Sequence, residues 1–115
     1  MQSPAVTAAY ETALPDDPRV KLKTAFGTPA AFVKRQMFFG TFKETLIARV
    51  GPERAEVLIE QAGIQSFSPS PGQTWDDYVQ LDLTVDPATL AALAIEALGW
   101  AAALPKKGKW RPSYT

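Results

Sequence analysis

Two chemically versatile side chains are missing from this sequence of 115 residues, which contains no cysteine and no histidine. Without cysteine there is no disulfide framework, no thiolate nucleophile and no cysteine-based zinc or iron–sulfur site. Without histidine the chain lacks the usual general base near neutral pH and the commonest metal ligand. The two absences together exclude Ser-His-Asp and Cys-His catalysis.

Net charge and long apolar runs are missing as well. Twelve Lys+Arg balance twelve Asp+Glu, so no overall field draws the protein to nucleic acid or to an anionic membrane. The most apolar stretch, residues 88–104, is shorter than the roughly 20 apolar residues that cross a bilayer. The N-terminus reads Met1-Gln2-Ser3-Pro4, without the charged and apolar regions of a secretory signal. We therefore expect a cytoplasmic protein with no membrane contact.

Glycine-rich phosphate-binding loops do not occur either, since the sequence has neither G-x-x-x-x-G-K nor G-x-G-x-x-G. We expect no cofactor.

The composition is typical of a globular protein, with 46% apolar and 21% charged residues. This length favours a single domain, here residues 1–104, followed by a basic C-terminal tail, residues 105–115. We expect the tail to be disordered, as chain ends often are.

Three segments carry helix signals. Pro4, Pro52 and Pro87 each stand where the first helical residue is expected, and Asp86 is a suitable N-cap for the last helix. Apolar residues then recur with the helical period of 3.6. The predicted helices cover residues 4–14, 52–62 and 87–104.

Five strands are expected between these helices. Val20, Leu22 and Thr24 alternate with lysines, which predicts one buried face with the lysines in solvent. Tight turns are expected at the charged pairs 34–35 and 43–44, where apolar runs end. Residues 66–73, rich in serine and proline, are expected to form an irregular surface loop. The predicted strands lie at residues 20–24, 31–33, 37–39, 46–50 and 79–85.

The predicted fold class is α+β, in the order α-β-β-β-β-α-β-α. Two-residue turns make neighbouring strands antiparallel, and amphipathic helices must bury their apolar stripe against a sheet. We expect a two-layer antiparallel sheet with the helices packed on one face. Phe38, Phe39 and Phe42 fall on both faces of one strand, so the other sheet face keeps apolar area or lies beneath a second layer.

A series of short motifs runs through the middle of the chain: AFGTPAAFV at residues 25–33, then Met37-Phe38, then Arg49-Val50-Gly51. This order resembles the Met-Phe-Gly, Phe-Val-Asn-Gly-x-Met-Phe and Leu-Arg-Leu motifs of the N-terminal domain of the TfoX/Sxy family. The similarity extends over residues 20–107, to a final helix that ends in Leu-Pro and lysines. The chain departs from the family pattern in three places. It has Ala25 where the family has methionine, Lys34-Arg35 where the family has Asn-Gly, and Gln73-Thr74-Trp75 where the family has Arg-Pro-Met.

The resemblance implies a two-layer α+β sheet similar to secretion-chaperone-like folds. Full-length members of the family regulate natural competence and carry a second, C-terminal domain, whereas this sequence matches the N-terminal unit. The family supplies no catalytic residues to carry over. We therefore expect a non-enzymatic regulatory or protein-interaction module.

Acidic pairs are the candidates for chemistry. Asp76 and Asp77 could form a metal-dependent hydrolase site, since hard cations accept carboxylate oxygens. Neighbouring residues of a strand point in opposite directions, however, and one pair lacks further ligands. We interpret Asp76 and Asp77, like Asp16 and Asp17, as solvated charges, and expect no catalytic and no metal-binding residues.

The basic tail is the candidate for nucleic-acid binding. Cations there alternate with aromatic residues, an arrangement in which phosphates meet the cations and bases stack on the rings. The alternative is a solvated chain end. The candidate contacts are Lys106, Lys107, Lys109, Trp110 and Arg111.

Two places are candidates for protein binding. Trp75 lies beside the serine- and proline-rich loop, where it could anchor a partner or fold onto the core. The side of the last helix that faces away from its apolar stripe carries small residues, so a second helix could approach it closely. That face includes Ile95 and Gly99, and it predicts a homodimer or a docked protein partner. Its residues are Ala92, Ile95, Glu96, Gly99 and Ala103.

Overall fold

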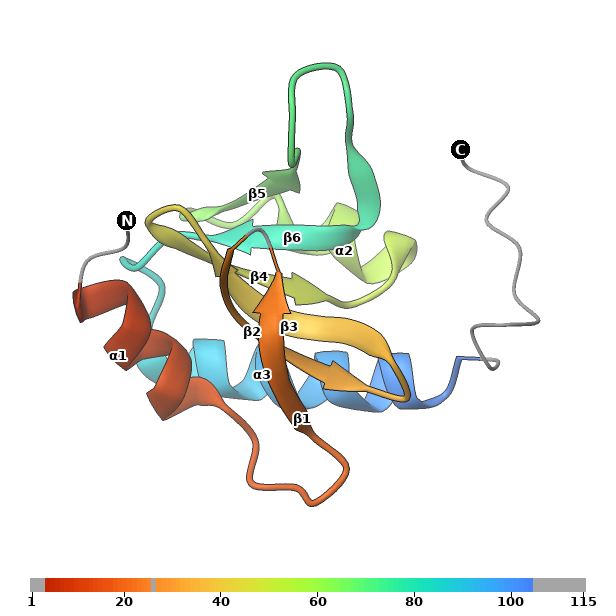
Figure 1. The fold of residues 1–115 in the computed structure, drawn as a ribbon. Helices are drawn as coiled ribbons and strands as arrows, with labels where there is room; N and C mark the ends of the chain where they lie inside the picture. The colour runs from red at the N-terminus through yellow and green to blue at the C-terminus, as the bar shows by residue number, and fades with distance from the viewer. Residues whose placement is uncertain (1–3, 26, 105–115) are drawn as a thin grey trace.

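The computed structural model describes residues 4–25 and 27–104 (Figure 1). It has a mixed α/β fold, with three helices and a six-stranded antiparallel sheet. None of the helices in these residues is long and apolar enough to cross a membrane. The elements are α1 (Pro4–Ala13), β1 (Lys21–Ala25), β2 (Thr28–Val33), β3 (Gln36–Phe42), β4 (Thr45–Arg49), α2 (Pro52–Leu58), β5 (Ile64–Phe67), β6 (Trp75–Leu81) and α3 (Pro87–Ala102).

The strands lie in the order β1-β2-β3-β4-β6-β5, which puts β1 and β5 at the two edges. The predicted order of elements was wrong by one strand, because β5 lies after the predicted second helix, partly in an unassigned stretch and partly in the predicted loop at residues 66–73. β5 has only four residues, and its two central ones are exposed while its ends are buried. This burial pattern lacks the alternation by which a strand is recognised in a sequence.

The helix starts are confirmed by the structure. α3 begins at Pro87, and the Asp86 carboxylate accepts a hydrogen bond from the backbone N–H of Ala88. α2 ends at Leu58, four residues before the predicted end, because the chain turns there to enter β5. β6 likewise ends at Leu81. The predicted continuation of this strand to Val85 was wrong, since the N–H of Val85 donates a hydrogen bond to the carbonyl of Asp82 and closes a turn there.

Both predicted tight turns are present. Lys34 and Arg35, between β2 and β3, have φ values of 52° and 68°, and Lys43, between β3 and β4, has 54°. The two positive angles at Lys34 and Arg35 match a type I′ turn, which prefers Asn-Gly. For residues with a side chain this left-handed conformation costs roughly 1–2 kcal/mol each. The turn at Lys34-Arg35 is therefore built from residues that do not favour it.

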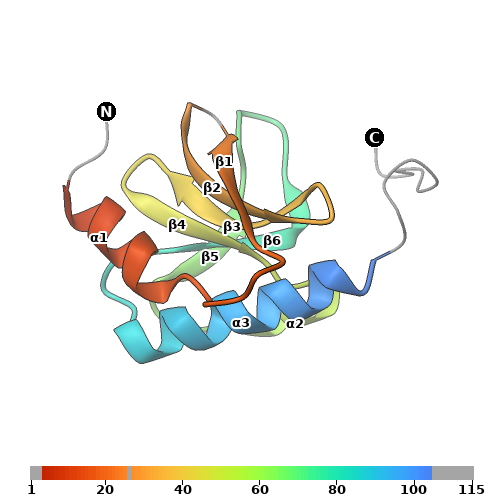
Figure 2. The same ribbon diagram turned by 60° about the horizontal axis from the view of Figure 1, so that its bottom comes forward.

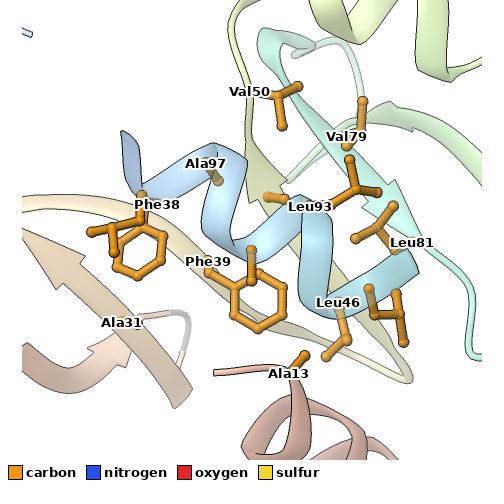
Figure 3. Packing of buried hydrophobic residues seen from close by; sticks show 14 of the residues in the cluster. Ala13, Ala31, Phe38, Phe39, Leu46, Val50, Val79, Leu81, Leu93 and Ala97 are labelled. Atoms are coloured by element: carbon orange, nitrogen blue, oxygen red, sulfur yellow. The ribbon is translucent and has the colours of Figure 1, made fainter. Parts of the chain in front are cut away.

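A bulge in β3 decides how its aromatic residues are used. Ala31 pairs with Phe39 and Phe32 pairs with Met37, so Phe38 is an extra residue in the ladder. An extra residue lets two consecutive side chains point to the same face. Phe38 and Phe39 both enter the core beneath the helices, next to α3 in Figure 3.

The helices cover one face of the sheet. Buried side chains of α1, α2 and α3 join those of the central strands in one hydrophobic core, part of which is drawn in Figure 3. The other face carries a second, aromatic cluster to which no described helix contributes. The prediction that helices pack on one face is confirmed for the described residues. The second cluster consists of Ala30, Met37, Phe42, Ile47, Phe67 and Tyr78, with Ala25, Phe32 and Trp75 at its margin.

Strand β1 lies outside the region that the helices cover. Its Leu22 is 64% exposed, so the predicted burial of one face of this strand was wrong. α1 packs against β3 and β4, and α3 against β2, β3 and β4, whereas none of the three described helices makes an extensive contact with β1. Period-two alternation predicts a strand correctly here but cannot tell whether anything lies against its apolar side.

Candidate functional site

The outer face of α3 differs from an ordinary polar helix surface. Ile95 is 59% exposed, and Ala92, Gly99 and Ala103 are exposed beside it. A Cβ atom built at Gly99 would meet nothing within 4 Å. In Figure 2, α3 runs along the lower edge of the molecule, with its outer side turned away from the sheet. We call these four residues the α3 outer face.

One carboxylate flanks this face and it is paired. Arg54 of α2 donates a hydrogen bond from Nε to Oε2 of Glu96 at 2.8 Å, with side-chain exposures of 44% and 37%. An ion pair this exposed contributes at most about 1 kcal/mol to stability. The pair also changes the surface, because it neutralises the charge of Glu96 beside the α3 outer face.

The orientation of α3 is fixed by Trp100, the neighbour of Gly99. An added Cβ at Gly51, before α2, would lie 2.6 Å from Nε1 of Trp100, so the ring is in tight contact with the backbone there. Gly51 has a φ of 95°, which side chains disfavour, so both conformation and space require glycine. Because Trp100 points inward at this contact, Gly99 is held on the outer side.

Arg49 is the centre of a buried polar cluster that the sequence analysis missed. The residue is 8% exposed, and its Nε donates to Oδ2 of Asp77 at 2.6 Å. Its Nη1 donates to Oε1 of Gln36 at 2.9 Å. Its guanidinium carbon lies 5.6 Å from the ring centre of Tyr78 and 5.3 Å from that of Trp100, within the range of cation–π attraction. We call these five residues the Arg49 cluster.

The Arg49 cluster joins β3, β4, β6 and α3. The backbone carbonyl of Asp77 also accepts hydrogen bonds from the N–H groups of Val50 and Gly51, at 2.9 and 3.0 Å. These hydrogen bonds hold the start of α2 against β6, while Trp100 of α3 packs against Gly51. The signal in the sequence was an arginine within an apolar strand, since a charge there requires a buried partner.

Asp76 and Asp77, the predicted alternative metal site, are not brought together. Asp77 is engaged by Arg49, and Asp76 is exposed. Among the described residues no group of three or more acidic side chains could hold a metal ion. Asp17 instead pairs with Arg19 at 2.9 Å, and the hydrogen bonds from Arg19 lower the pKa of Asp17 to about 2. Asp16 beside it is exposed.

Trp75 lies on the opposite side of the sheet from α3. It is the first residue of β6, half-buried at the margin of the aromatic cluster, with its ring 5.4 Å from that of Phe67 and 5.3 Å from that of Tyr78. Trp75 and Ile95, the two predicted partner contacts, therefore cannot belong to one surface.

A shallow depression lies at the ends of β4, β5 and β6, with a volume of about 250 Å³. Its side chains largely satisfy one another, because Gln80 donates to Thr45 at 2.8 Å and Gln65 donates to Gln80 at 3.3 Å. Asp82 accepts a hydrogen bond from the N–H of Thr84. The depression therefore presents a polar surface, and the one charged side chain in its lining, Asp82, is engaged by the backbone of Thr84.

The basic residue Lys34 lies at the C-terminal end of α3. Nζ of Lys34 donates to the carbonyl of Ala102 at 2.8 Å, and in Figure 1 the β2–β3 turn lies beside this end of the helix. A cation here interacts favourably with the negative end of the helix dipole. The five candidate nucleic-acid contacts of the tail, Lys106 to Arg111, lie outside the described residues.

Comparison with protein-family models, with curated proteins and with solved structures found no match to this chain. The resemblance to the TfoX/Sxy N-terminal domain and the similarity to secretion-chaperone-like folds therefore stay predictions.

Proposed function

We propose that this protein is a non-enzymatic interaction module that forms a homodimer through the α3 outer face. The observation that carries the proposal is an exposed isoleucine on a helix face that otherwise carries alanine, glycine and one paired glutamate, since small residues let helix backbones approach closely. As in the sequence analysis, we assign the module to the TfoX N-terminal-like class, with a secretion-chaperone-like fold, a regulatory role and a cytoplasmic location.

A second copy fits this face better than an unrelated partner of opposite charge. In a two-fold dimer the same patch lies on both sides of the interface, so a patch with a net charge would repel its copy. The α3 outer face has none, because Glu96 at its flank is paired with Arg54. Ile95 would then bury its side chain against the partner helix, which is favourable by about 25 cal/mol for each Å² of apolar surface removed from water.

The test is the molar mass in solution of the wild type and of a Gly99→Leu variant, measured by light scattering after size-exclusion chromatography. Space around Gly99 is open in the single chain, so leucine should not disturb the fold. We expect a dimer for the wild type and a monomer for Gly99→Leu. Ile95→Lys should have the same effect.

Leu22→Lys is the matched control, because Leu22 is also a highly exposed aliphatic residue but lies on β1. This variant should stay dimeric. A wild type that is monomeric at every concentration, or a Gly99→Leu variant that stays dimeric while Leu22→Lys dissociates, would refute the proposed interface.

A further inference from the structure

Strand β1 is an open edge of the sheet. Among the described strands β2 is its only neighbour, and Lys21–Ala25 pairs with β2 in a regular register. Proteins usually blunt such an edge by making it very short, interrupting it with a bulge or covering it. The opposite edge strand, β5, has only four residues and an irregular register with β6. β1 is longer and regular, and none of the three described helices makes an extensive contact with it.

The backbone groups that point outward from β1 can be identified from its partner strand. Thr24 pairs with Pro29, whose carbonyl accepts a hydrogen bond from Oγ1 of Thr41 in β3 at 2.9 Å. The carbonyl of Pro29 therefore faces β3, and proline has no N–H to donate to β1, so the N–H and C=O of Thr24 point away from β2. Hydrogen-bonded and non-hydrogen-bonded pairs alternate along an antiparallel ladder, so the N–H and C=O of Leu22 point outward as well. No described strand pairs with these groups.

The side chains of β1 divide into a charged face and an apolar face. Lys21 and Lys23 point to one side, where Nζ of Lys23 lies 5.5 Å from the ring centre of Phe32. Within the part of the chain that the structure describes, neither lysine forms an ion pair. Leu22 points to the other side and is 64% exposed. The edge therefore combines open backbone groups with two lysines and an exposed aliphatic side chain.

Charge decides which kind of strand suits this edge. Pairing of two β1 strands would bring lysines of the same face together, and like charges opposite each other destabilise a sheet. A strand with carboxylates at the facing positions would instead form opposite-charge pairs with Lys21 and Lys23. An apolar residue between the carboxylates would lie beside Leu22 and remove part of its surface from water. Charge complementarity thus favours an acidic partner over a second copy of this chain.

We propose that β1 binds an extended acidic segment of a partner protein as an added strand of the sheet. The backbone of the segment pairs with the outward N–H and C=O groups of Leu22 and Thr24. Its acidic residues alternate with apolar ones, so that the former face the two lysines and the latter face Leu22. This function goes beyond the homodimer, and it does not use the α3 outer face.

The test is fluorescence anisotropy with a labelled peptide of about nine residues, an ordinary strand length, in which glutamate alternates with valine. The control peptide has the same composition, with its glutamates and its valines in two separate blocks. It therefore carries the same charge without the alternation that an added strand requires.

Three variants separate strand pairing from charge. Thr24→Pro removes an outward N–H and keeps the hydrogen bonds to β2, because proline is tolerated where the N–H of an edge strand faces solvent. Lys21→Glu with Lys23→Glu reverses the charged face of β1. The matched control, Lys34→Glu with Lys43→Glu, makes the same change in net charge at exposed positions of the two hairpin turns. The melting temperature of each variant will show that its fold is retained.

We expect the wild type to bind the alternating peptide at low salt and the block peptide much more weakly. Lys21→Glu with Lys23→Glu should weaken binding by roughly tenfold or more, and should instead bind a peptide with lysine in place of glutamate. Thr24→Pro should bind weakly, and the turn control should bind like the wild type. In hydrogen-exchange NMR the N–H groups of Leu22 and Thr24 should become protected when the peptide binds. Those of Lys21 and Lys23 should be protected already, by β2.

Three results would overturn the inference. The first is absence of binding of the alternating peptide by the wild type at low salt. The second is equal weakening by the β1 charge reversal and the turn control, which would mean that only net charge matters. The third is binding without new protection of the N–H groups of Leu22 and Thr24, which would mean that the lysines hold the peptide without an added strand. Gly99→Leu should bind the peptide like the wild type, so this test does not depend on the homodimer.

Discussion

Among substitutions that break one of the described ion pairs, we expect Asp77→Asn to cause the largest loss of stability. It would remove the carboxylate that pairs with the buried guanidinium of Arg49, although Asn can still accept a hydrogen bond. The side-chain exposures are 10% for Arg49 and 23% for Asp77, so the pair is largely withdrawn from water. Removing one partner of a buried pair costs 3–5 kcal/mol. Because Asp77 keeps some exposure, we expect about 3 kcal/mol.

A double-mutant cycle with Arg49→Met separates the interaction from the packing. Methionine replaces the aliphatic part of the arginine and removes the charge, so the double variant leaves no unpaired ion. We expect the two substitutions to be non-additive by about 2 kcal/mol, within the 0.5–3 kcal/mol usual for residues in direct contact. The assay is urea unfolding followed by tryptophan fluorescence, because Trp100 lies against Arg49.

With a urea dependence of about 1.5 kcal/mol per molar, a loss of 3 kcal/mol lowers the midpoint by about 2 M. Glu96→Gln is the control, since it breaks the exposed pair with Arg54 and should cost less than 1 kcal/mol. An Asp77→Asn variant no less stable than Glu96→Gln, or an additive cycle, would refute the view that the Arg49 cluster holds the sheet to α3.

Three further predictions concern single contacts. Gly51→Ala should destabilise the fold by about 2–4 kcal/mol in the same urea assay, because its Cβ would overlap Trp100 and its φ is 95°; an unchanged midpoint would contradict this. Burial raises the pKa of Tyr10 from 10.0 to about 12. Because the pKa is higher in the folded than in the unfolded chain, the contribution of this group to stability is fully present below pH 10 and is lost as the pH rises toward 12. Tyr10→Phe should remove this alkaline loss of stability. Identical pH profiles of the variant and the wild type would refute the prediction. Asp17, with a pKa lowered from 3.8 to about 2, should titrate near pH 2 by NMR, and Arg19→Ala should return the value toward 3.8; its contribution to stability is present above pH 3.8 and is lost as the pH falls toward 2.

Local signals in the sequence predicted local structure well. Asp86 followed by Pro87 located the start of α3. The charged pair Lys34-Arg35 located a hairpin turn, although the preferred turn sequence Asn-Gly is absent there. These features depend on residues within a few positions of one another. The composition of the α3 outer face could be read in the same way, because the helical period alone decides which residues share a side.

Long-range features could not be predicted. Arg49 pairs with Asp77 across 28 positions, and only the pairing of β4 with β6 brings them together. The bulge at Phe38 depends on the register between β2 and β3, and this register cannot be predicted from the residues of β3 alone. Leu22 is exposed because the helices end short of β1. In each case the missing information was the arrangement of elements.

Disulfide trapping tests the proposed homodimer most directly. The chain has no cysteine, so a disulfide in a single-cysteine variant can only join two copies at the introduced residue. If two α3 outer faces pack together, Gly99→Cys should form a covalent dimer rapidly under mild oxidation, while Leu22→Cys on β1 should not. Cross-linking of Leu22→Cys without cross-linking of Gly99→Cys, or of neither variant at any concentration, would contradict an interface at α3.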